Sequence, residues 1–202
     1  MSVKNIFTSI YKTNKWNSKE SVSGTGSEIR VTENLRSELP NLISEYNIKS
    51  ILDLPCGDFN WMSKIDLNGV DYIGADIVTD LIDKNRKYYP DFNFEVMNII
   101  EDKLPKVDLI IVRDCFVHLT YENINKSLLN IKSSGSKYLL TTSFIEKQNS
   151  DVANNGGWRP INLLKKPFNL NKYLNVINDG PKKYYGEKYK DKSMVLYDIL
   201  EI

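Results

Sequence analysis

Short apolar runs alternate with helix-forming segments between residues 50 and 144, and this alternation constrains the fold more than any other feature. Strands that alternate with helices indicate a parallel α/β sheet in three layers. The connections are then expected to be right-handed crossovers. The apolar runs cover residues 51–54, 72–76, 92–99, 107–112 and 138–143, and candidate helices lie at 58–65, 78–89 and 121–132.

The alternation stops after Phe144. A polar stretch over 147–171 is followed by two strand-like segments, near 173–177 and at 194–202. These segments complete a central, mostly parallel seven-stranded sheet with helices on both faces and an antiparallel last strand. A chain of 202 residues suits one such domain, placed at 1–202. Loops as long as 147–171 are often functional.

Charge and composition argue against several classes of protein. The 27 basic and 26 acidic side chains nearly cancel, so a strongly basic face for nucleic acid is not implied. The two cysteines form no CxxC motif or Cys/His cluster, which disfavours a disulfide scaffold and a zinc site. The start lacks the apolar region of a signal peptide, and no apolar run approaches the roughly 20 residues that cross a bilayer. We therefore expect a soluble, cytoplasmic protein without a membrane span.

The turn after the first apolar run carries the strongest chemical signal. Residues 50–58 form an apolar strand that ends in an acid, followed by a tight turn. Open α/β sheets bind ligands beyond the carboxyl ends of their strands, and Gly57 lets the backbone approach a ligand closely. Asp53 and Asp58 would repel a phosphate and attract an ammonium or sulfonium group. The turn therefore favours S-adenosylmethionine (SAM) over a dinucleotide.

A second acid, Asp76, ends the next apolar run. A carboxylate at the tip of that strand can accept hydrogen bonds from both hydroxyls of a ribose. Dinucleotide enzymes share this device, so Asp76 alone indicates only a nucleoside. Combined with the acidic first turn, it favours SAM.

Three segments together resemble the class I SAM-dependent methyltransferases: Leu52–Met62, Tyr72–Val78 and Arg113–Leu119. The resemblance extends from near Trp16 to the last residue. More narrowly, the chain resembles a small bacterial and viral group linked to glycan methylation. This resemblance implies a Rossmann-like fold, SAM as cofactor with S-adenosylhomocysteine (SAH) as product, and a saccharide or other small molecule as acceptor. A viral member would work in the host cytoplasm.

The chain also departs from the common class I pattern. Pro55 and Phe59 stand where that pattern has glycines, and Asn98 stands where an acid often meets the adenine amine. The side-chain amide of Asn98 is expected to bond adenine instead. The cofactor contacts predicted on this basis are Asp53, Leu54, Pro55, Cys56, Gly57, Asp76, Ile77, Asn98, Ile99, Arg113, Gly24 and Ser27.

The first 27 residues are expected to cover the cofactor. Ser27 can cap a helix that carries Glu28 in its first turn and is interrupted by Pro40. The Gly24–Ser27 loop would then lie at a helix N-terminus, where backbone N–H groups bind anions, and could hold the SAM carboxylate.

Two residues after the fourth strand are candidates for the base. By the geometry of the fold, Arg113 and Asp114 flank the transferred methyl group, and His118 is the only histidine of the chain. O-methylation needs a base to remove the hydroxyl proton, and an imidazole with a pKa of about 6.5 suits that role. Asp114 is the competing base, or the group that orients it. No metal is required, although Asp114 and Asp151 would allow a Mg²⁺-assisted variant.

The loop 147–171 is the predicted acceptor-binding segment. Trp158 offers a flat face on which a sugar ring can stack, and Arg159 and Asn162 offer hydrogen-bond donors. These features favour O-methylation of a sugar hydroxyl in a glycan or saccharide precursor. The alternatives are N- or O-methylation of another small molecule, a protein or a nucleic acid, and a SAM-binding subunit without catalysis.

Overall fold

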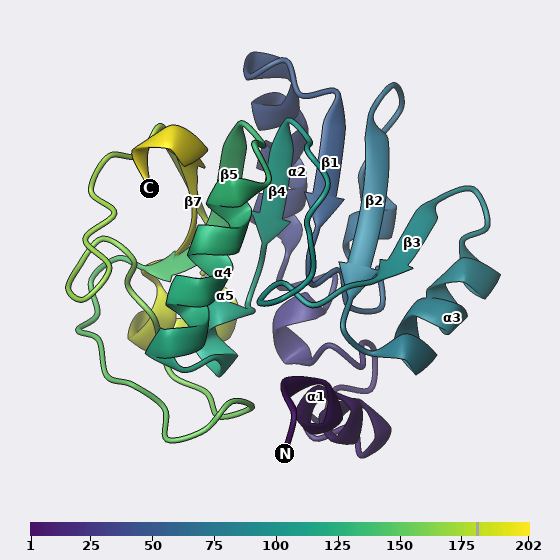
Figure 1. Ribbon diagram of the computed structural model, residues 1–202, viewed down its shortest axis with the longest axis horizontal. Coiled ribbons are helices and arrows are strands. Elements are labelled where there is room, and N and C mark those ends of the chain that lie inside the picture. The colour runs from purple at the N-terminus through teal and green to yellow at the C-terminus, as the bar shows by residue number, and fades with distance from the viewer. Residues whose placement is uncertain (181) are drawn as a thin grey trace.

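A computed structural model describes residues 1–180 and 182–202 and contains one seven-stranded sheet (Figure 1). Its strand order is β3-β2-β1-β4-β5-β7-β6. Strands β1 to β5 pair in parallel, whereas β7 is antiparallel to both β5 and β6. The expected mostly parallel sheet with an antiparallel last strand is therefore confirmed. The strands are β1 (Ser50–Asp53), β2 (Asp71–Asp76), β3 (Asn93–Val96), β4 (Leu109–Val112), β5 (Tyr138–Phe144), β6 (Asn175–Asn178) and β7 (Lys192–Asp198).

The strand order reverses beside β1, and this reversal determines where a ligand can bind. The chain moves outward from β1 to β3 and then returns to place β4 on the other side of β1. In open α/β sheets, a crevice forms beyond the carboxyl ends of the strands at such a switch point. The turns after β1, β2 and β4 meet there.

Helices cover both faces of the sheet, as the sequence predicted. Successive side chains of a strand point to opposite faces. Ile51 therefore packs in the core beneath α2 (Glu33–Glu45) and α3 (Thr79–Tyr88). Leu52 packs in the core beneath α4 (Tyr121–Ser133).

The carboxyl edge of the sheet carries a helix that the sequence pattern did not reveal. Helix α1 (Val3–Lys12) lies across this edge, at the bottom of Figure 1. The remaining helical elements are short: α5 (Lys182–Tyr185) and the 3₁₀ turns Thr25–Ser27, Met62–Lys64, Phe116–His118, Gly186–Tyr189 and Ile199–Glu201. No helix in the described part of the chain is long and apolar enough to cross a membrane.

The helix predicted at 58–65 does not form. Gly57 and Phe59 both have positive φ, at 56° and 60°, so the backbone turns back instead of continuing into a helix. The Phe59 ring is fully buried and packs edge-on or tilted against four aromatic rings, which favours this bent path over a helical one. Only the 3₁₀ turn Met62–Lys64 remains of the predicted helix.

The helix predicted to begin at Ser27 begins later. Ser27 closes a 3₁₀ turn and caps no helix, because α2 starts at Glu33 after Thr32. The Gly24–Ser27 loop therefore does not lie at a helix N-terminus. Pro40 also does not interrupt α2, since the buried Leu35, Leu39 and Leu42 hold the helix against the sheet on either side of it.

Candidate functional site

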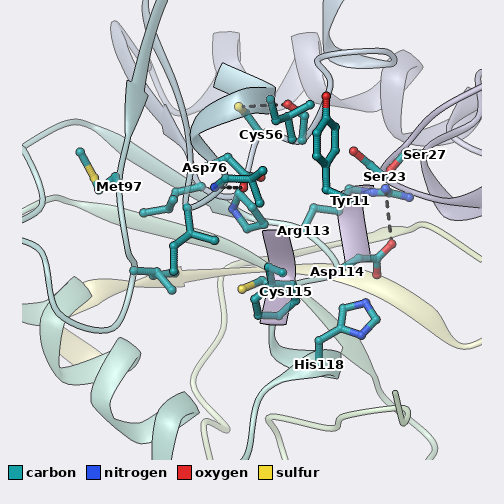
Figure 2. Close-up of a pocket in the computed structure, with 18 of the residues that line it drawn as sticks. Tyr11, Ser23, Ser27, Cys56, Asp76, Met97, Arg113, Asp114, Cys115 and His118 are labelled. Carbon is teal, nitrogen blue, oxygen red and sulfur yellow. Dashed lines mark hydrogen bonds and ion pairs between the residues drawn. The ribbon is translucent and has the colours of Figure 1, made fainter. Parts of the chain in front are cut away.

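A first cavity opens at the switch point, among the turns that follow β1, β2 and β4 (Figure 2). Its empty space, including the solvent-open mouth, is about 980 Å³. Residues of α1 and the side chain of Trp16 form its outer wall. The predicted cofactor residues that line it are Leu54, Pro55, Cys56, Gly57, Asp76, Ile77, Asn98, Ile99, Arg113 and Ser27.

Asp76 places a buried carboxylate in this cavity. Burial raises its pKa to about 6, and the backbone N–H groups of Val78, Gly57 and Ile77 offset part of the rise. One of these bonds, from the Val78 N–H to a carboxylate oxygen, is 3.0 Å long. The carboxylate is thus held by its own turn and by the turn after β1, and it lines the cavity as a hydrogen-bond acceptor.

The turn after β1 is fixed in shape by its neighbours. Gly57 has φ of 56°, and a Cβ at this position would collide with the hydroxyl of Ser23. The side-chain amide of Asn85, on α3, donates to the Gly57 carbonyl at 2.7 Å. Only glycine satisfies both the backbone conformation and the close approach.

Asp53, predicted as a cofactor contact, does not line the first cavity. It is 1% exposed and accepts a hydrogen bond from the Tyr72 hydroxyl at 2.8 Å. Burial raises its pKa to about 7, while the bond from Tyr72 and the charge of Arg113 act in the opposite direction. Because β1 ends at Asp53, this side chain supports the turn from behind.

Asp58 fastens the N-terminal segment to the turn. Its carboxylate accepts hydrogen bonds from the Ser21 hydroxyl at 2.9 Å, the Val22 N–H at 2.9 Å and the Ser23 hydroxyl at 3.3 Å. The acid of the motif is therefore bonded within the protein and does not line the first cavity, although its charge contributes to the raised pKa of Asp76.

Asn98 lines the first cavity, but its amide is engaged locally. The amide nitrogen donates to Glu101 at 3.2 Å, and the amide oxygen accepts from the Ile100 N–H at 3.1 Å. A ligand that bonds to Asn98 would share these groups with the segment after β3.

A second cavity of about 750 Å³ of empty space adjoins the first. Both cavities are lined by Trp16, Ser23, Asp114 and His118, which we call the shared wall. Gly24, predicted as a cofactor contact, lines the second cavity and not the first. The other residues of the second cavity are Thr25, Gly26, Phe144, Trp158, Tyr189 and Lys192.

His118 is held in the shared wall by aromatic rings and one hydrogen bond. Its ring stacks on Trp16 with centroids 4.8 Å apart and meets the edge of Phe7. Its Nδ1 lies 2.7 Å from the Gly157 carbonyl oxygen. A carbonyl only accepts, so Nδ1 carries the proton and the neutral ring has its lone pair on Nε2. Burial lowers the pKa of His118, with the Gly157 bond and the Asp114 charge opposing it.

Asp114 lies beside two cations. Lys192 Nζ is 2.7 Å from its carboxylate, and an Arg113 nitrogen is 3.4 Å away. Burial by itself would raise the pKa of Asp114, but the charges of Lys192 and Arg113 outweigh it and lower the pKa to about 2. So weak a base does not suit proton removal near neutral pH, which leaves His118 as the better candidate.

Arg113 joins three parts of the chain. Its guanidinium pairs with the buried Asp179, donating from Nε at 3.0 Å, and also donates to the Gly26 carbonyl at 2.8 Å. Arg113 therefore links the end of β4 to the segment after β6 and to the N-terminal loop. It lines the first cavity while it holds these elements together.

The three predicted acceptor residues separate in the structure. Trp158 lines the second cavity, where it is 48% exposed and meets Phe144 and Tyr189 edge-on. Arg159 and Asn162 line neither cavity.

Arg159 and Asn162, predicted to bind the acceptor, donate hydrogen bonds to backbone carbonyls. Arg159 donates to the carbonyls of Phe116 and Leu119, each at 2.6 Å. Asn162 is fully buried and donates to two carbonyls of its own loop, those of Ile145 and Lys147. Their donors satisfy backbone groups that the absence of regular structure leaves without ladder partners.

No group of three or more His, Cys, Asp or Glu side chains gathers in the described residues in a way that could hold a metal ion. The two acids considered for Mg²⁺ have separate partners. Asp114 pairs with Lys192, whereas Asp151 accepts from the Tyr121 N–H and lies near Arg159.

Sequence reasoning missed four residues that shape the site: Trp16, Tyr189, Lys192 and Asp179. Trp16 was visible as an aromatic in a polar segment, yet nothing local linked it to His118. Lys192 and Asp179 are buried ions, at 3% and 1% exposure, and charged residues are seldom buried unless paired. Their pairing spans the end of β6 and the start of β7, so no short motif contains it.

Comparison with known proteins found similarity at the level of structure. No protein-family model matches the sequence, and neither does any curated protein. Magnesium protoporphyrin IX methyltransferase from Synechocystis PCC 6803, solved with SAH bound, is similar with a TM-score of 0.65 at 12% identity, covering 93% of this chain and 92% of that one. A SAM-dependent methyltransferase from Clostridium acetobutylicum ATCC 824 is similar with a TM-score of 0.59 at 12% identity, covering 82% and 91%.

The methyltransferase domain of the bacterial protein CtHen1 is a third similar structure, with a TM-score of 0.61 at 12% identity, and 83% of this chain and 99% of that one are covered. These likenesses show that the chain has the Rossmann-like fold of the SAM-dependent methyltransferases. The fold class expected from the sequence is therefore confirmed.

Proposed function

We propose that this chain is a SAM-dependent O-methyltransferase that acts on a sugar hydroxyl in a glycan or saccharide precursor. The observation that carries the proposal is the shared wall, which places His118 and Asp114 between two adjoining cavities. The first cavity would hold the cofactor and the second the acceptor. Methyl transfer requires two such sites that meet at the reacting atoms.

The residues of the first cavity fit SAM. Asp76 would accept hydrogen bonds from the ribose hydroxyls, and Ile77 and Ile99 would flank the adenine. Ser27 and the backbone around Gly57 would hold the methionine part. When bound, SAM supplies an electrophilic methyl group on a sulfonium. Related folds solved with SAM or SAH bound support this choice of cofactor.

His118 would receive the proton of the acceptor hydroxyl on Nε2. The Gly157 carbonyl fixes the tautomer that leaves this nitrogen unprotonated, and burial favours the neutral ring. Trp16 and Phe7 hold the ring in place. Preorganisation of this kind is what an efficient general base needs.

The second cavity supports a sugar acceptor. Trp158, Phe144 and Tyr189 form a cluster of rings on one side, and Trp158 leaves part of its surface exposed. Ser23 and Thr25, which carry hydroxyls, also line this cavity. A sugar has apolar ring faces that stack on aromatics and hydroxyls that bond to such groups.

Two measurements test the proposal. Calorimetry should detect SAM binding, and tritiated SAM should label at least one member of a panel of glycans and nucleotide sugars, with NMR locating the methyl on oxygen. Failure to bind millimolar SAM would overturn the cofactor assignment. Binding without transfer to any saccharide, but with transfer to an amine, protein or nucleic acid, would overturn the acceptor assignment alone.

A further inference from the structure

Asp114 adopts a backbone conformation that its neighbours enforce. Its φ is 51°, in the left-handed region that non-glycine residues seldom adopt, although aspartate and asparagine tolerate it best. Its N–H donates to the Thr142 hydroxyl at 2.9 Å. Such conformations cluster at functional sites. Here the result is that the carboxylate stands in the shared wall, at the end of β4.

The carboxylate of Asp114 is a permanent acceptor. Lys192 Nζ at 2.7 Å and Arg113 at 3.4 Å hold it ionised, and an ionised carboxylate accepts hydrogen bonds but donates none. Its side chain is 27% exposed, so part of it remains open to the cavities. Figure 2 shows Asp114 and His118 on the same side of the first cavity. The shared wall therefore offers a carboxylate that can accept a hydrogen bond from one hydroxyl, beside a base for another hydroxyl.

We propose that the acceptor is a vicinal diol: one hydroxyl is methylated at His118, and Asp114 binds the hydroxyl on the next carbon. This inference rests on the proposed function and restricts the methyl acceptor to molecules with two hydroxyls on adjacent carbons. Asp114 and His118 both line both cavities, so one ligand at their junction can meet the two side chains. A ligand with two neighbouring hydroxyls would bond to both.

The charges at Asp114 also select against anions at this point. Lys192 and Arg113 are paired with Asp114 and Asp179, so the cluster of two cations and two carboxylates carries no formal net charge. A phosphate or carboxylate placed at Asp114 would meet a carboxylate first. A neutral polyol instead donates a hydrogen bond to it without repulsion.

Binding to the SAH-loaded full chain tests the inference without turnover. The probes are methyl α-D-glucopyranoside, methyl α-D-galactopyranoside and methyl α-D-mannopyranoside, their monodeoxy analogues, and cyclohexane-1,2-diol against cyclohexanol, all read by ligand-observed NMR. Diols should bind, and removal of one hydroxyl of the pair should weaken binding about tenfold or more, as for loss of a hydrogen bond to a charged group.

The matched variant is Asp114→Asn, because asparagine keeps the shape and tolerates positive φ. The Asp114→Asn variant should bind the diol only as tightly as it binds the deoxy analogue. Its affinity for the deoxy analogue should equal that of the unchanged protein. An unchanged affinity for SAH would show that the variant is folded. Thr142→Val is a second variant, which removes the hydroxyl that accepts from the Asp114 N–H but leaves the Asp114 carboxylate in place. That variant should retain the preference for diols.

The outcomes separate the two proposals. Equal binding of diol and mono-ol, equal losses for both probes in the Asn variant, or no binding of any polyol would each overturn the inference about Asp114. Diol binding that depends on Asp114, together with no methyl transfer to any polyol, would support the vicinal-diol site and overturn the proposed methylation.

Discussion

The two cavities are built in different ways. The first is made mainly from turns that follow β1, β2 and β4, so most of its residues lie in short, contiguous motifs. The second collects residues from the N-terminal loop, the end of β5, the irregular segment before β6 and the start of β7. The parallel sheet dictates the first cavity, whereas long-range packing creates the second. Changes confined to one cavity should therefore leave binding at the other intact, except at the shared wall.

The largest effect is expected at the shared wall, from His118→Asn. The asparagine amide can still donate to the Gly157 carbonyl but offers no base. We expect kcat to fall about 10²–10⁴-fold, the usual contribution of a general base, with the affinity for SAM nearly unchanged. Single-turnover transfer and calorimetry would measure the two quantities. An unchanged kcat would remove His118 from the chemistry.

The next largest effect is expected within the first cavity, where Asp76 and Asp53 form a matched pair of buried acids. Asp76→Asn should weaken SAM binding about 100-fold, since hydrogen bonds to a charged group contribute about 1.5–3 kcal/mol each. Asp53→Asn should change SAM affinity far less, because Asp53 lies behind the turn. Equal losses in both variants, measured by calorimetry, would contradict the placement of the two acids.

A smaller effect is expected from Trp158, on the far side of the second cavity. Trp158→Ala should raise the acceptor KM about tenfold, because losing the burial of a large apolar side chain against a ligand costs about 1.5 kcal/mol or more. Trp158→Phe should recover most of the loss. SAM affinity should stay constant in both variants, and a parallel loss of SAM binding would show that the cavities are not independent.

The smallest effect is a displacement of the pH profile. Burial lowers the pKa of His118, so the neutral base persists to lower pH than for an ordinary histidine. Activity should therefore fall on the acid side at a pH below about 6.5, the unperturbed value. This acid limb should disappear in His118→Asn, and a limb above the ordinary histidine value would contradict the buried, neutral ring.

The sequence predicted the first cavity well because its information is local. Alternating apolar runs determined the parallel sheet, and the residues at the strand ends then had to meet at one edge. Ten of the twelve predicted cofactor residues line that cavity. Asp53 lies outside this cavity because its carboxylate faces the Tyr72 hydroxyl, and Gly24 lines the second cavity instead.

The second cavity was harder to predict because its residues depend on distant partners. Arg159 and Asn162 had the right chemistry for an acceptor, but Arg159 donates to the carbonyls of Phe116 and Leu119, and Asn162 donates to those of Ile145 and Lys147. Lys192 meets Asp114 only because β5 and β7 pair in antiparallel register. The helix predicted at 58–65 does not form for the same reason. Phe59 is buried among rings that are distant in the sequence, and this packing overrides the local helix propensity.

The attachment of the N-terminal segment bears on the order of events in a catalytic cycle. Trp16 stacks on His118, and the same segment supplies Phe7 and the roof of the first cavity, held at Asp58. Release of SAH would therefore require displacement of this segment. The same displacement would remove the Trp16 ring that holds His118 in place. SAH release and the repositioning of His118 would then be one movement. The three hydrogen bonds at Asp58 would limit the rate of that movement. Asp58→Asn should accordingly speed the dissociation of SAH in stopped-flow measurements, and an unchanged rate would assign exit to another route.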